Sequence, residues 1–96
     1  MTRNFAGSVK IEFLKDFIKR MLVYYDPMDL IILGAPHDEY DNDIDEIMKL
    51  AMKYSITVGE LSVSILNLYR KDASDLVSLK RKSERMAEDL IYMKKS

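Results

Sequence analysis

The sequence predicts an all-α protein of about five helices, arranged as a small antiparallel bundle or an orthogonal array, with a longer helix at the C-terminal end. Apolar residues recur every three or four positions through most of the chain, as they do on one face of a helix. No segment alternates apolar and polar residues in the way that predicts a half-buried strand. Glycine, proline and helix-capping residue types separate these repeats at short intervals, which favours short connections between helices.

The composition indicates one folded domain. The chain has 96 residues, of which 48% are hydrophobic and 32% charged, enough to fill one core and to keep the surface polar. We expect a single helical domain over 1–96. Within it we expect a flexible N-terminus over 1–7, a core over 8–73 and an amphipathic C-terminal helix over 74–96.

The expected location is the cytoplasm. The chain has no cysteine, which fits a reducing compartment. Its longest apolar run, Met28 to Ala35, is far shorter than the roughly 20 residues that span a bilayer. No apolar stretch of signal-peptide length precedes Lys10. We therefore expect no contact with a membrane.

The first helix is predicted over about 8–25. Ser8 can cap its first turn, and four positively charged residues lie opposite a wide apolar stripe. The stripe consists of Val9, Phe13, Phe17 and Met21, with Leu14, Ile18, Leu22 and Tyr25 beside them.

A short second helix is predicted from Pro27 to Leu33. Asp26 can accept hydrogen bonds from the first free amides, and proline already has the helical φ at the first position. Gly34 is expected to end this helix, and the loop that follows is expected to extend to Asp38.

Three more helices are predicted towards the C-terminus, over about 41–54, 57–71 and 74–94. The first has acidic residues near its start, where the helix dipole favours negative charge. The second begins with a capping box formed by Thr57 and Glu60, flanked by apolar residues at both staple positions. A break before the third is favoured because the apolar stripe changes phase near Asp72 to Asp75.

The candidate binding site lies in an acidic segment. From Asp26 to Glu46 there are eight acidic residues and no lysine or arginine. Such a face attracts a basic partner and disfavours other partners, so we expect a protein partner with a basic surface. The alternative is that these acids only stabilise a helix start. The candidate partner-binding residues are Asp38, Glu39, Tyr40, Asp41, Asp43 and Asp45.

Two other binding modes stay open. The last helix carries an apolar seam with alternating spacings of three and four, which favours either packing within the chain or a homodimer. The apolar residues of the seam are Leu76, Leu79, Met86, Leu90 and Met93, and Ser83 occupies the position between Leu79 and Met86. The same helix carries Lys80, Arg81, Lys82 and Arg85, which could contact nucleic acid phosphates, although interleaved acids make that the less favoured partner.

The sequence gives no support for catalysis, a metal or a cofactor. Asp41, Asp43 and Asp45 match three positions of a calcium loop, but Glu46 and Met52 occupy the positions that require glycine and glutamate. His37 is the only histidine and has no nucleophile motif to accompany it. We therefore expect a non-catalytic protein.

One segment resembles a family of small uncharacterised bacterial helical proteins. The resemblance rests on YDPMDLI at 25–31, GAPHDEYD at 34–41 and DEI at 45–47, and extends over about 24–70. The family usually has tryptophan at the position of Tyr25, and its members tend to end before a helix as long as 74–94. Because some relatives look like immunity or accessory proteins of toxin systems, the resemblance implies an immunity or antitoxin-type inhibitor.

Overall fold

The computed structural model describes residues 7–95, and within that range the chain is helical and has no strand. The all-α prediction is confirmed for these residues. Four α-helices and two short 3-10 helices follow one another, in place of the five helices expected. They are α1 (Gly7–Tyr25), η1 (Asp41–Asp43), α2 (Ile44–Ala51), α3 (Val58–Tyr69), η2 (Arg70–Asp72) and α4 (Leu76–Lys95).

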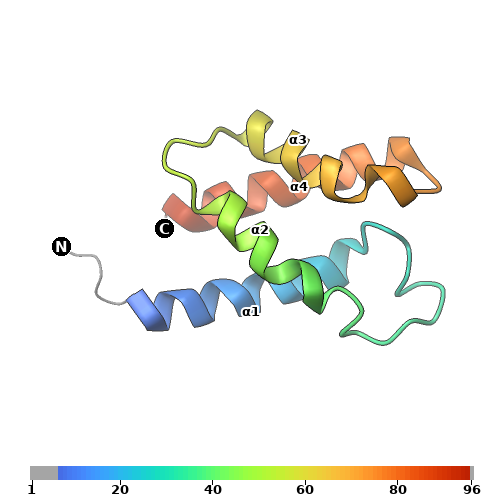
Figure 1. Cartoon of the computed structure of the whole chain (residues 1–96), viewed down its shortest axis with the longest axis horizontal. Helices are drawn as coiled ribbons and strands as arrows, with labels where there is room; N and C mark the ends of the chain where they lie inside the picture. The colour runs from blue at the N-terminus through green and yellow to red at the C-terminus, as the bar shows by residue number, and fades with distance from the viewer. Residues whose placement is uncertain (1–6, 96) are drawn as a thin grey trace.

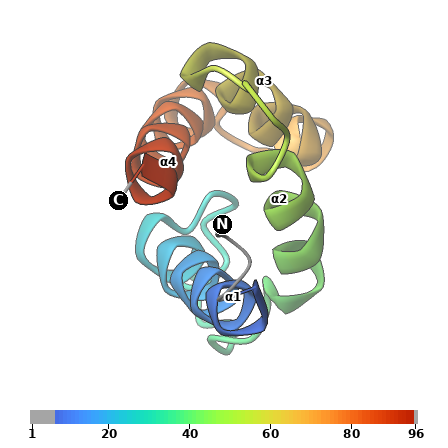
Figure 2. The ribbon, with the colours of Figure 1, turned by 90° about the vertical axis from the view of Figure 1, so that its left-hand side faces the viewer.

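The helices surround one core. α3 and α4 lie side by side and run in opposite directions, joined through η2, and make the most extensive contact between two elements (Figure 1). α1 lies against α2 and α4, and the end-on view shows all four helices arranged in a ring (Figure 2). Each of the four α-helices contributes large apolar side chains that have no solvent exposure. They are Ile18, Leu22, Ile47, Leu61, Ile65, Leu79, Met86 and Leu90.

The predicted helix from Pro27 to Leu33 is absent. Residues 27–34 form consecutive turns instead, because the backbone takes the left-handed conformation at Asp26 (φ 51°) and at Asp29 (φ 59°). A right-handed helix cannot pass through such residues. Asp26 does accept hydrogen bonds from free amides, as predicted, but those amides belong to a turn.

The boundaries of the other helices differ from the predictions by a few residues. α2 ends at Ala51, three residues earlier than expected, and the chain then turns through Ser55 with φ 64°. The capping box at the start of α3 is present in full. The break before α4 is confirmed, since Ala73 is extended. Residues 1–6 of the predicted flexible N-terminus lie outside the described residues, and Gly7 already belongs to α1.

Within residues 7–95, no helix combines the length and the apolar character that crossing a bilayer requires.

Candidate functional site

The segment from Asp26 to Tyr40, here called the Asp26 loop, links α1 to η1 and is held by one buried carboxylate. Asp26 is only 8% exposed. Its two oxygens accept hydrogen bonds from the amides of Ile31 (3.0 Å) and Ile32 (2.9 Å) and from the hydroxyl of Tyr40 (2.5 Å). Three donors from two parts of the loop therefore converge on one side chain, which fixes the backbone of the turn.

Tyr40 joins the Asp26 loop to the core. Its hydroxyl donates to Asp26 and accepts from the amide of Met28 at 2.9 Å. Its ring packs edge-on against Tyr69 with 6.2 Å between ring centroids, and its side chain is almost fully buried. Tyr40 was a predicted partner-binding residue, but this burial leaves it no surface to offer a partner. Its role is structural.

Lys82 attaches the same loop to the C-terminal helix α4. Its Nζ donates to the backbone carbonyl of Asp26 at 2.8 Å and to the Oδ1 of Asp29 at 2.9 Å. Lys82 is half-buried in this position. It is therefore engaged within the chain, whereas Lys80, Arg81 and Arg85 of the predicted basic cluster are exposed.

The electrostatics of this network follow from its burial and hydrogen bonds. Burial by itself raises the pKa of the Asp26 carboxyl group, but the hydrogen bonds from Tyr40, Ile31 and Ile32 outweigh it and bring the pKa below its ordinary value. Burial, followed by the hydrogen bond to Asp26, raises the pKa of Tyr40 well above its ordinary value. Asp26 is therefore an anion at neutral pH and Tyr40 a neutral donor.

Three acids of the predicted binding cluster have partners within the chain. Asp41 pairs with Lys19 at 3.1 Å and Asp45 pairs with Lys15 at 3.3 Å, both lysines coming from α1. The Oδ2 of Asp43 accepts a hydrogen bond of 2.9 Å from the buried residue Tyr69. The negative charge that we expected to be free is thus paired with lysines of the first helix at Asp41 and Asp45, while Asp43 is engaged by a neutral hydroxyl of α3.

Asp38 and Glu39 are the part of the predicted cluster that stays free. Both are exposed, and neither side chain has a hydrogen bond or ion pair with any residue in the described range 7–95. Of the five acids in the predicted cluster, the structure therefore leaves two without a partner in the described range. Both lie on the Asp26 loop.

The Asp26 loop also exposes two large apolar residues that the sequence analysis did not single out. Ile32 is 79% exposed and Leu33 is 80% exposed, whereas Met28, Leu30 and Ile31 pack against the core. The signal in the sequence was the apolar run from Met28 to Ala35. The sequence analysis predicted a short helix over most of this run, but the chain forms turns there that bury some of its apolar side chains and expose others.

The predicted oligomer seam on the last helix is used within the chain. Leu79, Met86 and Leu90 have no solvent exposure and belong to the single core, while Leu76 is half-exposed and Met93 half-buried. The repeat of three and four reflects packing of α4 against its neighbours, which is the commoner meaning of such a repeat. It leaves no continuous apolar stripe for a second copy.

No group of three or more potential metal ligands occurs among the side chains that the structure describes. His37, the one histidine, is exposed on the Asp26 loop.

No protein-family model, curated protein or solved structure matches this chain. The resemblance to the bacterial helical family stays a prediction from the sequence alone.

Proposed function

We propose that this is a non-catalytic protein-binding protein in which the Asp26 loop is the contact surface. The observation that carries the proposal is an ordered loop with two adjacent aliphatic side chains, Ile32 and Leu33, each about 80% exposed. Single exposed apolar residues are common on protein surfaces, but two adjacent ones on a loop with a fixed backbone form contiguous apolar surface, which favours an interaction site.

The order of the loop favours binding. A flexible loop loses conformational freedom when a partner fixes it, and that loss weakens the complex. Here the backbone is fixed in advance. The amides of Gly34 and Ala35 donate to the carbonyls of Ile31 and Leu30, each at 2.9 Å. Gly34 supplies the positive φ of 105° that closes the turn behind Leu33.

The charge of the loop favours a basic partner. Asp38 and Glu39 lie on the same loop as the apolar pair and have no internal partner in the described range, so their field is free to steer a positively charged surface. An enzyme that binds nucleic acid has such a surface, because it must attract phosphates. An immunity or antitoxin-type inhibitor of such an enzyme is the form of this function that we propose.

Photo-crosslinking in the source cell tests the proposal. A photoreactive phenylalanine in place of Leu33 should give one discrete protein adduct, whereas the same replacement of Tyr54, which is 98% exposed on another part of the surface, should not. The double variant Asp38→Lys/Glu39→Lys should reduce the yield at position 33 about tenfold, through lost attraction and added repulsion.

The matched control is the double variant Glu12→Lys/Glu46→Lys, which changes the net charge equally on exposed positions of α1 and α2. It should leave the yield at position 33 unchanged. Equal adducts from positions 33 and 54, or no adduct from position 33, would reject the Asp26 loop as the contact surface.

A further inference from the structure

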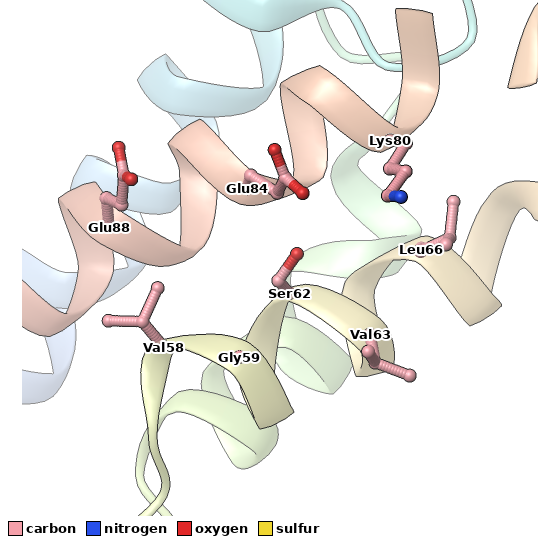
Figure 3. A pocket seen from close by; sticks show the side chains of 8 residues that line it. All are labelled: Val58, Gly59, Ser62, Val63, Leu66, Lys80, Glu84 and Glu88. Atoms are coloured by element: carbon pink, nitrogen blue, oxygen red, sulfur yellow. The ribbon is translucent and has the colours of Figure 1, made fainter. Parts of the chain in front are cut away.

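A second surface of the molecule is a groove between α3 and α4, here called the α3–α4 groove. It has a volume of about 370 Å³ and lies between Val58 to Leu66 on one side and Lys80 to Glu88 on the other (Figure 3). None of these residues belongs to the Asp26 loop. What binds here is therefore a separate question from the function proposed above.

The α3 side of the groove is hollowed and mostly apolar, with Ser62 as its polar lining residue. Val58 is 36% exposed and Val63 56% exposed, and Leu66 is partly buried between them and the core. Gly59 has no side chain to fill the space beside Val58. A Cβ atom added at Gly59 would have one neighbour, the Oγ1 of Thr57 at 4.0 Å, so that position opens directly onto the groove.

The α4 side of the groove is charged. Glu84 and Glu88 are one helical turn apart on the same face, and Lys80 lies one turn before Glu84. All three side chains are exposed, and none of them has a hydrogen bond or ion pair with another residue of the described chain. Figure 3 shows Lys80 and Glu84 on the wall that faces Ser62 and Leu66 of α3.

We infer that the α3–α4 groove binds an amphipathic helix of a partner protein, with two basic residues one turn apart opposite Glu84 and Glu88. An apolar floor beside a helix is the usual seat of such a ligand, which buries residues at positions i, i+3, i+4 and i+7. The two free carboxylates select basic residues and repel acidic ones. They also repel nucleic acid phosphates, so the charge pattern favours a peptide ligand.

The order of charges adds a directional preference. Along α4 the sequence of charges on the groove is positive, negative, negative, from Lys80 to Glu88. A ligand helix that places an acidic residue near Lys80 and basic residues near both glutamates satisfies all three. The preferred ligand therefore carries its acid and its two bases at successive intervals of one turn.

The test uses a synthetic peptide of 18 residues and the full isotope-labelled chain. The peptide forms an amphipathic helix with leucines on one face and two arginines four residues apart beside them, and a matched peptide has glutamate in place of each arginine. NMR titration at low salt should show saturable shifts confined to residues 58–66 and 80–88 with the arginine peptide. The glutamate peptide should bind at least about tenfold more weakly.

Two variants locate the binding in the groove. Gly59→Leu places a side chain in the open space and should abolish the shifts without unfolding α3, since glycine disfavours a helix and leucine favours it. Glu84→Lys/Glu88→Lys should weaken the arginine peptide about tenfold and strengthen the glutamate peptide. Circular dichroism checks that both variants keep the helical content of the parent chain.

The control Glu12→Lys/Glu46→Lys should bind both peptides as the parent does. Shifts on the Asp26 loop, equal binding of both peptides, or full binding by Gly59→Leu would each overturn the inference. A concentration-dependent shift of the groove residues without peptide, lost in Gly59→Leu, would identify a second copy as the occupant and would also overturn it.

Discussion

At Asp26 the backbone takes a φ of 51°, which non-glycine residues adopt rarely, although aspartate tolerates it better than most. The buried carboxylate offsets this conformation by accepting three hydrogen bonds, and the backbone carbonyl of Asp26 accepts two more, from Lys82 and from the amide of Asp29. One residue thereby connects the end of α1, the turn that follows it and α4. Changes to its partners should affect the loop before they affect the helices.

Tyr40→Phe removes the hydroxyl that donates to Asp26 and accepts from Met28. Because the carboxylate and the amide stay buried without that partner, we expect the free energy of unfolding to fall by about 1–3 kcal/mol. The amides of Ile31 and Ile32 should exchange faster with solvent, since the acceptor that fixes them becomes more mobile. Chemical denaturation and hydrogen exchange measure the two effects.

The control for this prediction is Tyr54→Phe, because Tyr54 is 98% exposed. It should change the free energy of unfolding by no more than about 0.5 kcal/mol. Equal stability of the two variants would contradict a structural role for the Tyr40 hydroxyl.

Acid should destabilise the protein partly through Asp26. Burial raises the pKa of Asp26, but the hydrogen bonds from Tyr40, Ile31 and Ile32 reverse that effect, so the folded-state pKa lies below its unfolded value, near 3.8. The resulting stability is present above pH 4 and is lost as the pH falls through the folded pKa. Denaturation between pH 6 and about 2 should show a shallower decline in Asp26→Asn than in the parent chain.

If Asp26→Asn does not fold, Tyr40→Phe gives the same information, because it keeps the carboxyl group but removes one cause of the lowered pKa. Parallel pH profiles for the variant and the parent would contradict the assignment to Asp26.

Among the elements, α3 was the best predicted, because its signals are local. Thr57 accepts from the amide of Glu60 at 3.1 Å, and the Glu60 carboxylate accepts from the amide of Thr57 at 3.0 Å. The Asp26-Pro27 signal is equally local but was misleading. The carboxylate of Asp26 accepts a hydrogen bond from Tyr40. Its backbone carbonyl accepts one from Lys82, which is 56 residues away in the sequence. No pattern within one turn could have revealed those partners.

The ion pairs that neutralise the predicted acidic face were also hidden by their distance in sequence. Lys15 and Lys19 are one turn apart on α1 and meet Asp45 and Asp41 in reverse order, as expected for antiparallel segments. The matching intervals of four were visible in the sequence, but the register between the segments depends on core packing. Asp38 and Glu39 have no lysine partner because they lie before Asp41, the first residue of the segment that pairs with α1.

Thr57→Ala tests the capping box as an element-level feature. Loss of the acceptor for the Glu60 amide should lower the free energy of unfolding by about 1 kcal/mol. Thr57→Ser keeps the hydroxyl and should lie within a few tenths of a kcal/mol of the parent. Thermal and urea denaturation of the three proteins decide the matter, and equal loss in both variants would show that the threonine methyl group is the stabilising part.

At the scale of the whole molecule, three tyrosines tie the elements together by donating to aspartates. Tyr25 at the end of α1 donates to Asp89 of α4 at 2.6 Å, Tyr69 of α3 donates to Asp43 of η1, and Tyr40 donates to Asp26. These bonds link α1 to α4 and α3 to η1, and the third closes the Asp26 loop, which connects α1 to η1 in the ring of helices seen end-on (Figure 2). A core in a chain of this size is small, so such polar ties are a substantial part of what holds the arrangement.

This arrangement predicts a loss of stability at alkaline pH. The hydrogen bond to Asp89 and then burial raise the pKa of Tyr25 to about 12, and burial together with Asp26 or Asp43 raises the pKa values of Tyr40 and Tyr69 further. Since unfolded tyrosine ionises near pH 10, the folded state favours the protonated phenols. Their contribution is complete below about pH 10 and is lost as the pH rises through the folded-state values.

Urea denaturation at intervals from pH 8 to about 12 should therefore show a steep decline in stability above about pH 10. Lysines also lose their charge in this range, so the tyrosine share is isolated by comparing the parent chain with Tyr25→Phe. The variant starts from lower stability because it lacks the bond between α1 and α4, but it should lose less on going from pH 9 to pH 11. A difference between parent and variant that stays constant across that range would mean that the pKa of Tyr25 is the same in the folded and unfolded states, which would contradict this prediction.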